Sequence, residues 1–104
     1  MLETPTYPAR IVARFWSYCA KGGPDECWPW LMYRYMGYGR FRGERWFGTR
    51  RAHKVAYMIV RGPVPDGMEL DHTCRVRCCV NPFHLDAVPH RTNCQRGEVG
   101  QHLK

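Results

Sequence analysis

The chain has 104 residues, a formal net charge of +7 and 44% hydrophobic residues, which predicts one folded domain over residues 1–104 with a small core. This composition excludes a disordered chain, and no apolar stretch is long enough to span a membrane. The first residues lack the basic and apolar segments of a secretion signal. We therefore expect a cytoplasmic protein without a membrane partner.

The first half of the chain predicts a helix, a strand and a hairpin. Apolar residues share one helical face between Pro8 and Ala20, and a strand is expected to begin at Cys27–Trp30. Residues 38–42 and 45–49 predict a β-hairpin across Gly43–Glu44, because glycine suits the first position of a two-residue turn. Three side chains would then share one face of the hairpin: Tyr38, Arg40 and Arg42.

The second half predicts a longer helix and then two strands around a loop. Apolar residues recur with helical spacing from Arg51 to Arg61, and Gly62–Pro63 should end that helix. Strands are expected at Met68–His72 and near Leu85–Val88, on either side of a metal-binding loop. A last short helix is expected from Pro89 to about Gly97.

Arginine and aromatic residues alternate between residues 34 and 51, where Glu44 is the one acid. The planar arginine side chain matches phosphate, and clustered positive charge favours a polyanionic partner. We therefore predict nucleic acid as the partner, with a merely solvated basic surface as the alternative. The candidate contact residues, two of them in the metal-binding loop, are Arg40, Arg42, Arg45, Arg51, Arg75 and Arg77.

Six cysteines are many for a chain of this length, and an even number could form disulfides in a secreted protein. However, no export signal is visible, and a histidine lies at ligand spacing among the thiols. Cys74, Cys79 and His84 therefore predict a structural zinc site in a reducing compartment.

The segment from Asp71 to Leu85, with Asn93 after it, resembles the ββα-metal module of HNH endonucleases. The likeness is closest to the His-Cys box type and to small bacteriophage HNH proteins. The residues that carry it in the module are Asp71, His72, Cys74, Cys79, Asn81, Pro82, His84, Leu85 and Asn93. Upstream, the likeness extends to Cys27–Trp30, Gly37–Phe41 and Arg51–Tyr57.

The resemblance implies an α+β fold, a small zinc-stabilised domain with a C-terminal ββα-metal, or His-Me finger, module. The core of that module would cover about residues 67–98. A zinc-linked region at about 8–62 would precede it and supply a helix, a basic β-hairpin and a second helix. Residues 99–104 would form a tail.

The resemblance also implies a metal-dependent DNA endonuclease that hydrolyses phosphodiester bonds. His72 matches the general base, and Asp71 and Asn93 match the ligands of a catalytic Mg²⁺ or Mn²⁺. Adjacent strand residues point to opposite faces, so both residues have a second interpretation, Asp71 as the cap of a turn and His72 as a side chain packed beneath the loop. The candidates for steadying negative charge in the transition state are Arg40, Arg51 and Arg75.

A structural zinc needs a fourth ligand, and the resemblance places Cys27 in that position. The competing candidates are Cys78, Cys94 and His90. His53 lies partly off the apolar stripe of its helix, so it is a core residue, a neighbour of the site or a DNA contact.

Two other functions remain open on the sequence alone. A zinc-stabilised DNA-binding module without catalysis explains the charge, the aromatics and the thiols, but not the spacing of His72 and Asn93. A secreted disulfide protein would contain no zinc. The resemblance further suggests a phage-encoded protein acting inside a bacterial cell, and it leaves a homodimer or a phage partner protein undecided.

Overall fold

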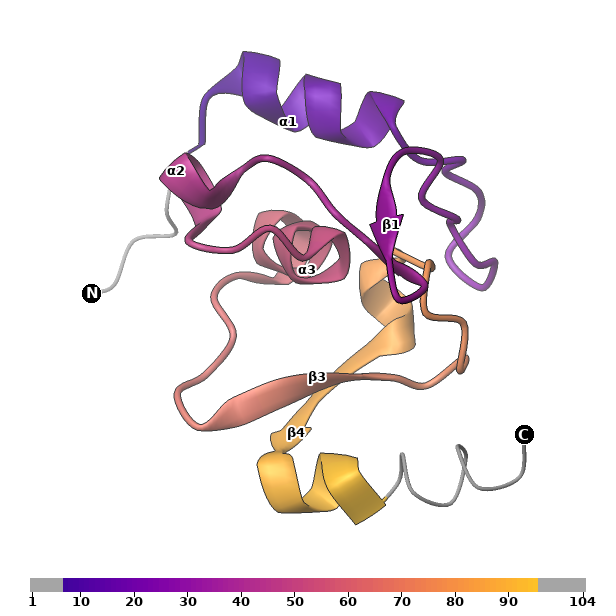
Figure 1. Cartoon of the computed structure of the whole chain (residues 1–104), viewed down its shortest axis with the longest axis vertical. Coiled ribbons are helices and arrows are strands. Elements are labelled where there is room, and N and C mark those ends of the chain that lie inside the picture. The colour runs from indigo at the N-terminus through magenta and orange to yellow at the C-terminus, as the bar shows by residue number, and fades with distance from the viewer. Residues whose placement is uncertain (1–6, 96–104) are drawn as a thin grey trace.

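The computed structural model describes residues 7–95 as an α+β fold of short helices and two-stranded sheets, which confirms the predicted class (Figure 1). The predicted tail at 99–104 lies outside the described residues. In chain order the elements are α1 (Ala9–Ser17), β1 (Arg34–Tyr35), β2 (Tyr38–Gly39), α2 (Glu44–Phe47), α3 (Ala52–Arg61), β3 (Met68–His72), the 3₁₀ helix η1 (Pro82–His84) and β4 (Leu85–Pro89).

The core is mainly aromatic and lies beneath α1. Ile11 and Phe15 are the buried side chains of that helix. The Phe15 ring lies 5.0 Å from that of Trp30 and 5.1 Å from that of Phe41, measured between centroids. Rings of this size bury much apolar surface and so contribute strongly to the stability of a small domain. The core therefore joins α1 to the segments that precede and follow the first hairpin.

Helix α3 forms as predicted and runs through the middle of the molecule, between α1 and the β3–β4 sheet (Figure 1). Its apolar face buries Ala52, Val55 and Ala56 completely. Gly62 ends it with a φ of 92°, a backbone conformation that side-chain-bearing residues rarely adopt. The same helix also buries His53.

The hairpin predicted across Gly43–Glu44 is wrong. Residues 44–47 form the short helix α2 instead, and Gly48 ends it in the left-handed conformation with a φ of 69°. The hairpin forms earlier in the chain, between β1 and β2. Its turn is made by Met36 and Gly37, whose φ angles of 52° and 89° are both positive, as a tight two-residue hairpin turn requires.

The strand expected to begin at Cys27–Trp30 is reduced to isolated bridges. Pro29 pairs with Cys79, and Trp30 pairs with Cys19. Two further main-chain bonds strengthen the first contact, from Val80 N–H to Trp28 O and from Trp30 N–H to Cys78 O, each 2.9 Å. This segment is therefore held directly against the loop that carries the predicted metal ligands.

Strands β3 and β4 form an antiparallel pair in which His72 lies opposite Leu85. Residues 90–95 are helical, so the expected last helix is present as far as the description reaches, and Gly97 lies outside it. The chain returns from β3 to β4 through the loop that contains Cys74 and Cys79. Among the described residues, no helix has the length and apolar character needed to cross a membrane.

Candidate active site and metal centre

A cleft of about 1200 Å³ lies between the first hairpin, α3, β3 and the helical residues 90–95. Asp71, His72 and Asn93 all line it. Asp71 and His72 are neighbours in β3, and both contribute to the lining of this cleft. Because the side chains of adjacent strand residues alternate, the role of Asp71 beside His72 stays a prediction.

His72 is buried and fixed by one hydrogen bond. Its Nε2 lies 3.1 Å from the main-chain oxygen of Cys79. A carbonyl oxygen can only accept, so Nε2 carries the hydrogen and Nδ1 keeps the lone pair of the neutral ring. Burial lowers the pKa of His72 below the ordinary value of 6.5, while the bond to Cys79 and the charge of Asp71 act in the opposite direction.

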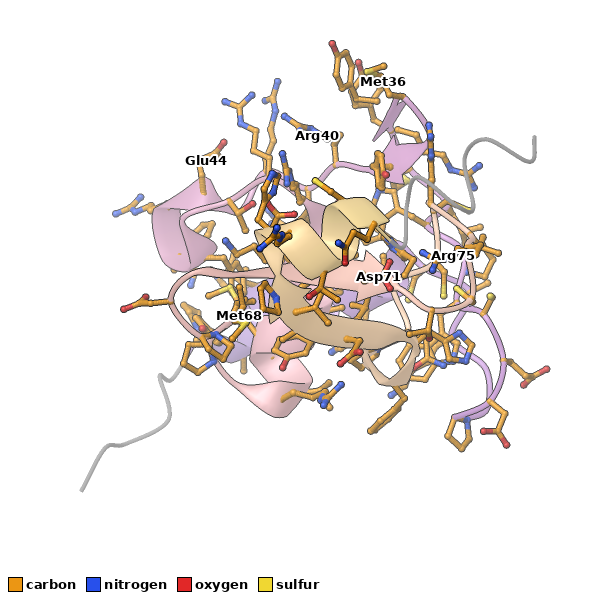
Figure 2. The ribbon with its side chains drawn as sticks, turned by 90° about the horizontal axis from the view of Figure 1, so that it is seen from below. Met36, Arg40, Glu44, Met68, Asp71 and Arg75 are labelled. Carbon is orange, nitrogen blue, oxygen red and sulfur yellow. The ribbon has the colours of Figure 1, made fainter. Side chains whose placement is uncertain are left out.

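Asp71 is 4% exposed and forms an ion pair with Arg75, whose Nη1 lies 2.7 Å from Asp71 Oδ1. Figure 2 shows the two side chains near one another, Asp71 within β3 and Arg75 in the loop that follows it. Arg75 has a positive φ of 62°, and its N–H donates to His72 O at 3.0 Å. A tight turn therefore brings the guanidinium back over the carboxylate.

Asn93 is held in the cleft by Glu69. Its Nδ2 donates to Glu69 Oε1 at 2.8 Å, and His90 pairs with the other carboxylate oxygen of Glu69. The hydrogen bonds from Asn93 and then from His90 lower the pKa of Glu69. Because Glu69 occupies the nitrogen of the carboxamide, the oxygen of Asn93 is the atom that can serve as a metal ligand.

His53 contributes a second imidazole to the cleft. Its ring centroid lies 4.6 Å from that of His72 and 5.8 Å from that of Tyr38. Nδ1 of His53 is buried without a hydrogen-bond partner within the part of the chain that the structure describes. Burial, followed by the proximity of His72, lowers the pKa of His53 to about 3, so the ring is neutral at ordinary pH.

Four other side chains converge in a separate cluster, which we call the Cys₃His cluster: Cys27, Cys74, Cys79 and His84. One ligand atom from each lies within 4.8 Å of all the others. His84 Nδ1 lies 3.7 Å from the sulfur atoms of both Cys27 and Cys79. Three thiols and one imidazole in this arrangement are compatible with zinc, and Cys78, Cys94 and His90 are not part of the cluster.

The protonation chemistry of the cluster also suits a cation. Burial, followed by hydrogen bonds with Cys74 and Cys79, raises the pKa of Cys27 to about 12. Thiols that would repel one another as anions become good ligands when a divalent cation balances their charge. The main-chain N–H of Trp28 lies 3.4 Å from Cys79 Sγ, which is the kind of contact that orients a metal-bound sulfur.

The predicted DNA contacts fall into three groups. Arg40, Arg51, Arg75 and Arg77 line the cleft, together with two basic residues that the sequence did not single out, Lys54 and Arg91. Arg42 lines a smaller adjacent hollow. Arg45 lies over the Trp46 ring and lines neither space. The cleft thus carries far more positive than negative charge.

Glu69 is an acidic residue of the site that sequence reasoning missed. It lies two positions before Asp71 in β3, and residues at that separation face the same side of a strand. That spacing was the available signal. The contacts of His53 gave no such signal, because its partners come from other elements.

Comparison with known proteins finds a family likeness over part of the chain. Residues 50–95 match the family model of the HNH endonucleases, which confirms the resemblance to that family over this part of the chain. The matched segment contains Asp71, His72 and Asn93.

A particular relative is the "Uncharacterized gene 5.3 protein" of Enterobacteria phage T3, which is 44% identical over 39 residues. That match covers 38% of this chain and 39% of the phage protein, so the chain spans about two fifths of the length of that relative. No solved structure matches the chain significantly.

Proposed function

We propose that this protein is a metal-dependent DNA endonuclease of the HNH type. The observation that carries the proposal is the single basic cleft that holds His72, Asp71 and Asn93 together. The match of residues 50–95 to the HNH endonuclease family supports it. On this proposal, β3, β4 and the helical residues 90–95 are the ββα-metal module.

His72 is the general base. Its Nε2–H is held by the Cys79 carbonyl, so Nδ1 can take a proton from a water molecule beside the scissile phosphate. The lowered pKa of His72 keeps the ring neutral near pH 7, where a base must be unprotonated to act. The hydroxide formed in this way attacks phosphorus, opposite the leaving 3′ oxygen.

Asp71 and Asn93 are the ligands of the catalytic cation. A carboxylate and a carboxamide oxygen are hard ligands that suit Mg²⁺ or Mn²⁺. Such a cation supplies charge stabilisation for the scissile phosphate and for the leaving oxygen. Glu69 holds Asn93 in place, while Arg75 balances the charge of Asp71. The surrounding basic side chains bind the DNA backbone.

The Cys₃His cluster is a structural zinc site on this proposal. Its donor set is rich in sulfur and none of its four ligands lines the cleft, which supports a role in folding rather than in hydrolysis. Action on DNA inside a bacterial cell, by a phage-encoded protein, is the matching biological setting, and the likeness to a phage T3 protein supports it.

The test is cleavage of supercoiled plasmid by zinc-loaded protein, with and without added Mg²⁺. We expect the parent to cut only when Mg²⁺ is added and the His72→Ala variant to bind DNA and zinc without cutting. Val60→Ala, which changes an exposed position of α3, is the matched control and should cut like the parent. Cleavage by His72→Ala at the parental rate would refute the assignment of His72 as the general base. Binding without cutting by the parent would favour the non-catalytic DNA-binding module.

A further inference from the structure

A second hollow of about 520 Å³ adjoins the catalytic cleft. Its lining consists of Tyr33, Tyr35, Arg40, Phe41, Arg42 and Arg50. Tyr35 and Arg40 line the cleft as well, so the two spaces lie side by side and share these two side chains. A nucleotide in the second hollow would therefore lie close to one in the cleft.

The side chains beside this hollow are unusually exposed for their type. Tyr33 is 69% exposed, Tyr35 is 57% exposed and Met36 is 70% exposed. Figure 2 shows Met36 at the projecting end of the hairpin, with Arg40 between that end and Glu44 in this view. A contiguous group of large exposed apolar side chains marks a binding surface, since exposure to water is unfavourable for each of them.

Hydrogen bonds and close packing hold the hairpin beside the tyrosine rings in place. Arg77 Nη1 donates to Met36 O at 3.2 Å, and Arg34 Nη2 donates to Trp30 O at 2.6 Å. Gly39 lies so close to Trp30 that an added Cβ would approach its ring to 2.6 Å. A surface held in this way loses little conformational entropy when a ligand binds.

The positive charge beside the tyrosine rings indicates which ligand the hollow would bind. Arg40 lies over the Tyr35 ring at 5.8 Å, and Arg42 makes no ion pair with the described residues. Arg50 is paired with Glu44, so Arg40 and Arg42 are the groups that can face phosphate. Aromatic rings alternating with arginines form the surface that binds single-stranded nucleic acid, by stacking on bases and pairing with the backbone.

We propose that this hollow binds an unpaired nucleotide next to the scissile phosphate, so that the preferred substrate has a single-stranded segment beside the cleavage position. The inference rests on the proposed nuclease function. An intact duplex keeps its bases stacked on one another, and its phosphates require only the basic residues. The exposed tyrosine rings can stack on a base only when that base is unpaired.

Binding can be measured separately from cleavage, with Ca²⁺ in place of Mg²⁺ and the full zinc-loaded chain. The probes are a short labelled duplex and the same duplex with a single-stranded thymidine tail, titrated at one salt concentration. We expect the tailed DNA to bind about tenfold more tightly, the factor typical of one stacked base. In the Tyr33→Ala/Tyr35→Ala variant the ratio of the two Kd values should fall toward one.

Two controls make the result specific. Tyr33→Phe/Tyr35→Phe retains both rings and should retain the preference, whereas a role of the hydroxyl groups would remove it. Phe83→Ala removes an exposed ring outside both hollows and should keep the parental ratio. Equal Kd values for the two probes with the parent, or an unchanged ratio in the double alanine variant, would overturn the inference. A preserved preference without Mg²⁺-dependent cleavage would keep the hollow as a binding site for an unpaired nucleotide, and would refute the nuclease proposal and the cleavage position together.

Discussion

Cys79 connects the two sites through a single residue. Its sulfur belongs to the Cys₃His cluster, and its main-chain oxygen accepts the hydrogen bond of His72 at 3.1 Å. Any change that moves the cluster therefore also moves the acceptor that sets the tautomer of the proposed base. This coupling explains why a structural metal would matter to catalysis without touching the substrate.

The neutral state of His53 predicts a stability that depends on pH. The folded-state pKa is about 3, against 6.5 for an ordinary histidine. Between these values the unfolded chain binds a proton that the folded chain excludes, so the free energy of unfolding falls as pH drops through this window. From pH 7 to pH 5 the loss due to His53 should be about 2 kcal/mol, since each pKa unit corresponds to about 1.4 kcal/mol.

The measurement for His53 is urea unfolding at both pH values, for the parent and for His53→Phe. The variant should lose less stability between pH 7 and pH 5, by about 2 kcal/mol, whatever its stability at pH 7. The Cys₃His cluster is the same in both proteins, so its contribution cancels in the comparison. An equal loss in the two proteins would show that His53 is not the source.

Glu69 should act on catalysis through Asn93. Glu69→Ala removes the acceptor of the carboxamide nitrogen, so we expect the cleavage rate to fall about 10- to 100-fold, as for other groups that orient metal ligands. The Mg²⁺ concentration giving half the maximal rate should rise with it. Glu69→Gln keeps an acceptor oxygen and should recover part of the loss.

The matched control for Glu69 is Asp66→Ala, which removes an exposed acid in the turn before β3. It changes the net charge equally and should leave both the rate and the Mg²⁺ dependence unchanged. A Glu69→Ala protein with parental Mg²⁺ dependence would contradict the positioning role.

For single residues, the sequence predicted the ligands that lie close together in the chain, and it missed the contacts between residues that lie far apart in the chain. Cys74, Cys79 and His84 lie in one short segment, so their spacing alone indicated a shared site. Cys27 came from the family resemblance, because a long stretch of chain separates it from the others. The contacts of Glu69 with Asn93, and of His53 with His72, depend on how separate elements pack.

Among the elements, Asn81 joins the first loop to the metal-binding loop. It is completely buried and donates from Nδ2 to Pro24 O at 2.9 Å and to Glu26 O at 2.7 Å. Its Oδ1 accepts from Phe83 N–H at 2.9 Å and caps η1. The Asn81 side chain therefore holds in place the segment that contains Cys27.

Replacing Asn81 should lower both stability and zinc affinity. Asn81→Ala loses three hydrogen bonds at a buried position, and we expect the free energy of unfolding to fall by about 1–3 kcal/mol. Zinc should also be lost at a lower chelator concentration, because Cys27 is no longer held near its partners. Asp25→Ala, an exposed change in the same loop, should behave like the parent in urea unfolding and chelator titration. If Asn81→Ala kept zinc as well as the parent does, Asn81 would have no part in holding the Cys₃His cluster together.

The misplaced hairpin shows where element prediction fails in this chain. Glycine at residue 43 suits a turn between two strands. The residues that follow it form a short helix instead, in which Phe47 is buried and which Gly48 ends. Met36–Gly37 was harder to recognise, because a methionine with a φ of 52° is uncommon. By contrast α3 follows a long periodic pattern of apolar residues, and it forms where predicted. Strands β3 and β4 also form where they were expected.

For the whole molecule, the proposed zinc site adds a cross-link to a small, mainly aromatic core. Figure 1 shows the described fold as short elements connected by long loops, with the β3–β4 sheet on the side opposite α1. The Cys₃His cluster joins Cys27, which follows α1, to the loop between β3 and β4. Zinc binding at such a site contributes free energy of folding on the order of 10 kcal/mol.

Cys27→Ser tests this dependence, because it removes the one cluster ligand that comes from the N-terminal half of the chain. The variant should retain little zinc and unfold at a much lower temperature than the parent, since the remaining ligands no longer tie the two halves together. Zinc content by elemental analysis and thermal unfolding by circular dichroism measure the two effects. Cys94→Ser alters an exposed thiol outside the cluster, so it should keep both the zinc and the melting temperature. A Cys27→Ser protein that binds zinc and melts like the parent would show that the halves are held together by packing alone.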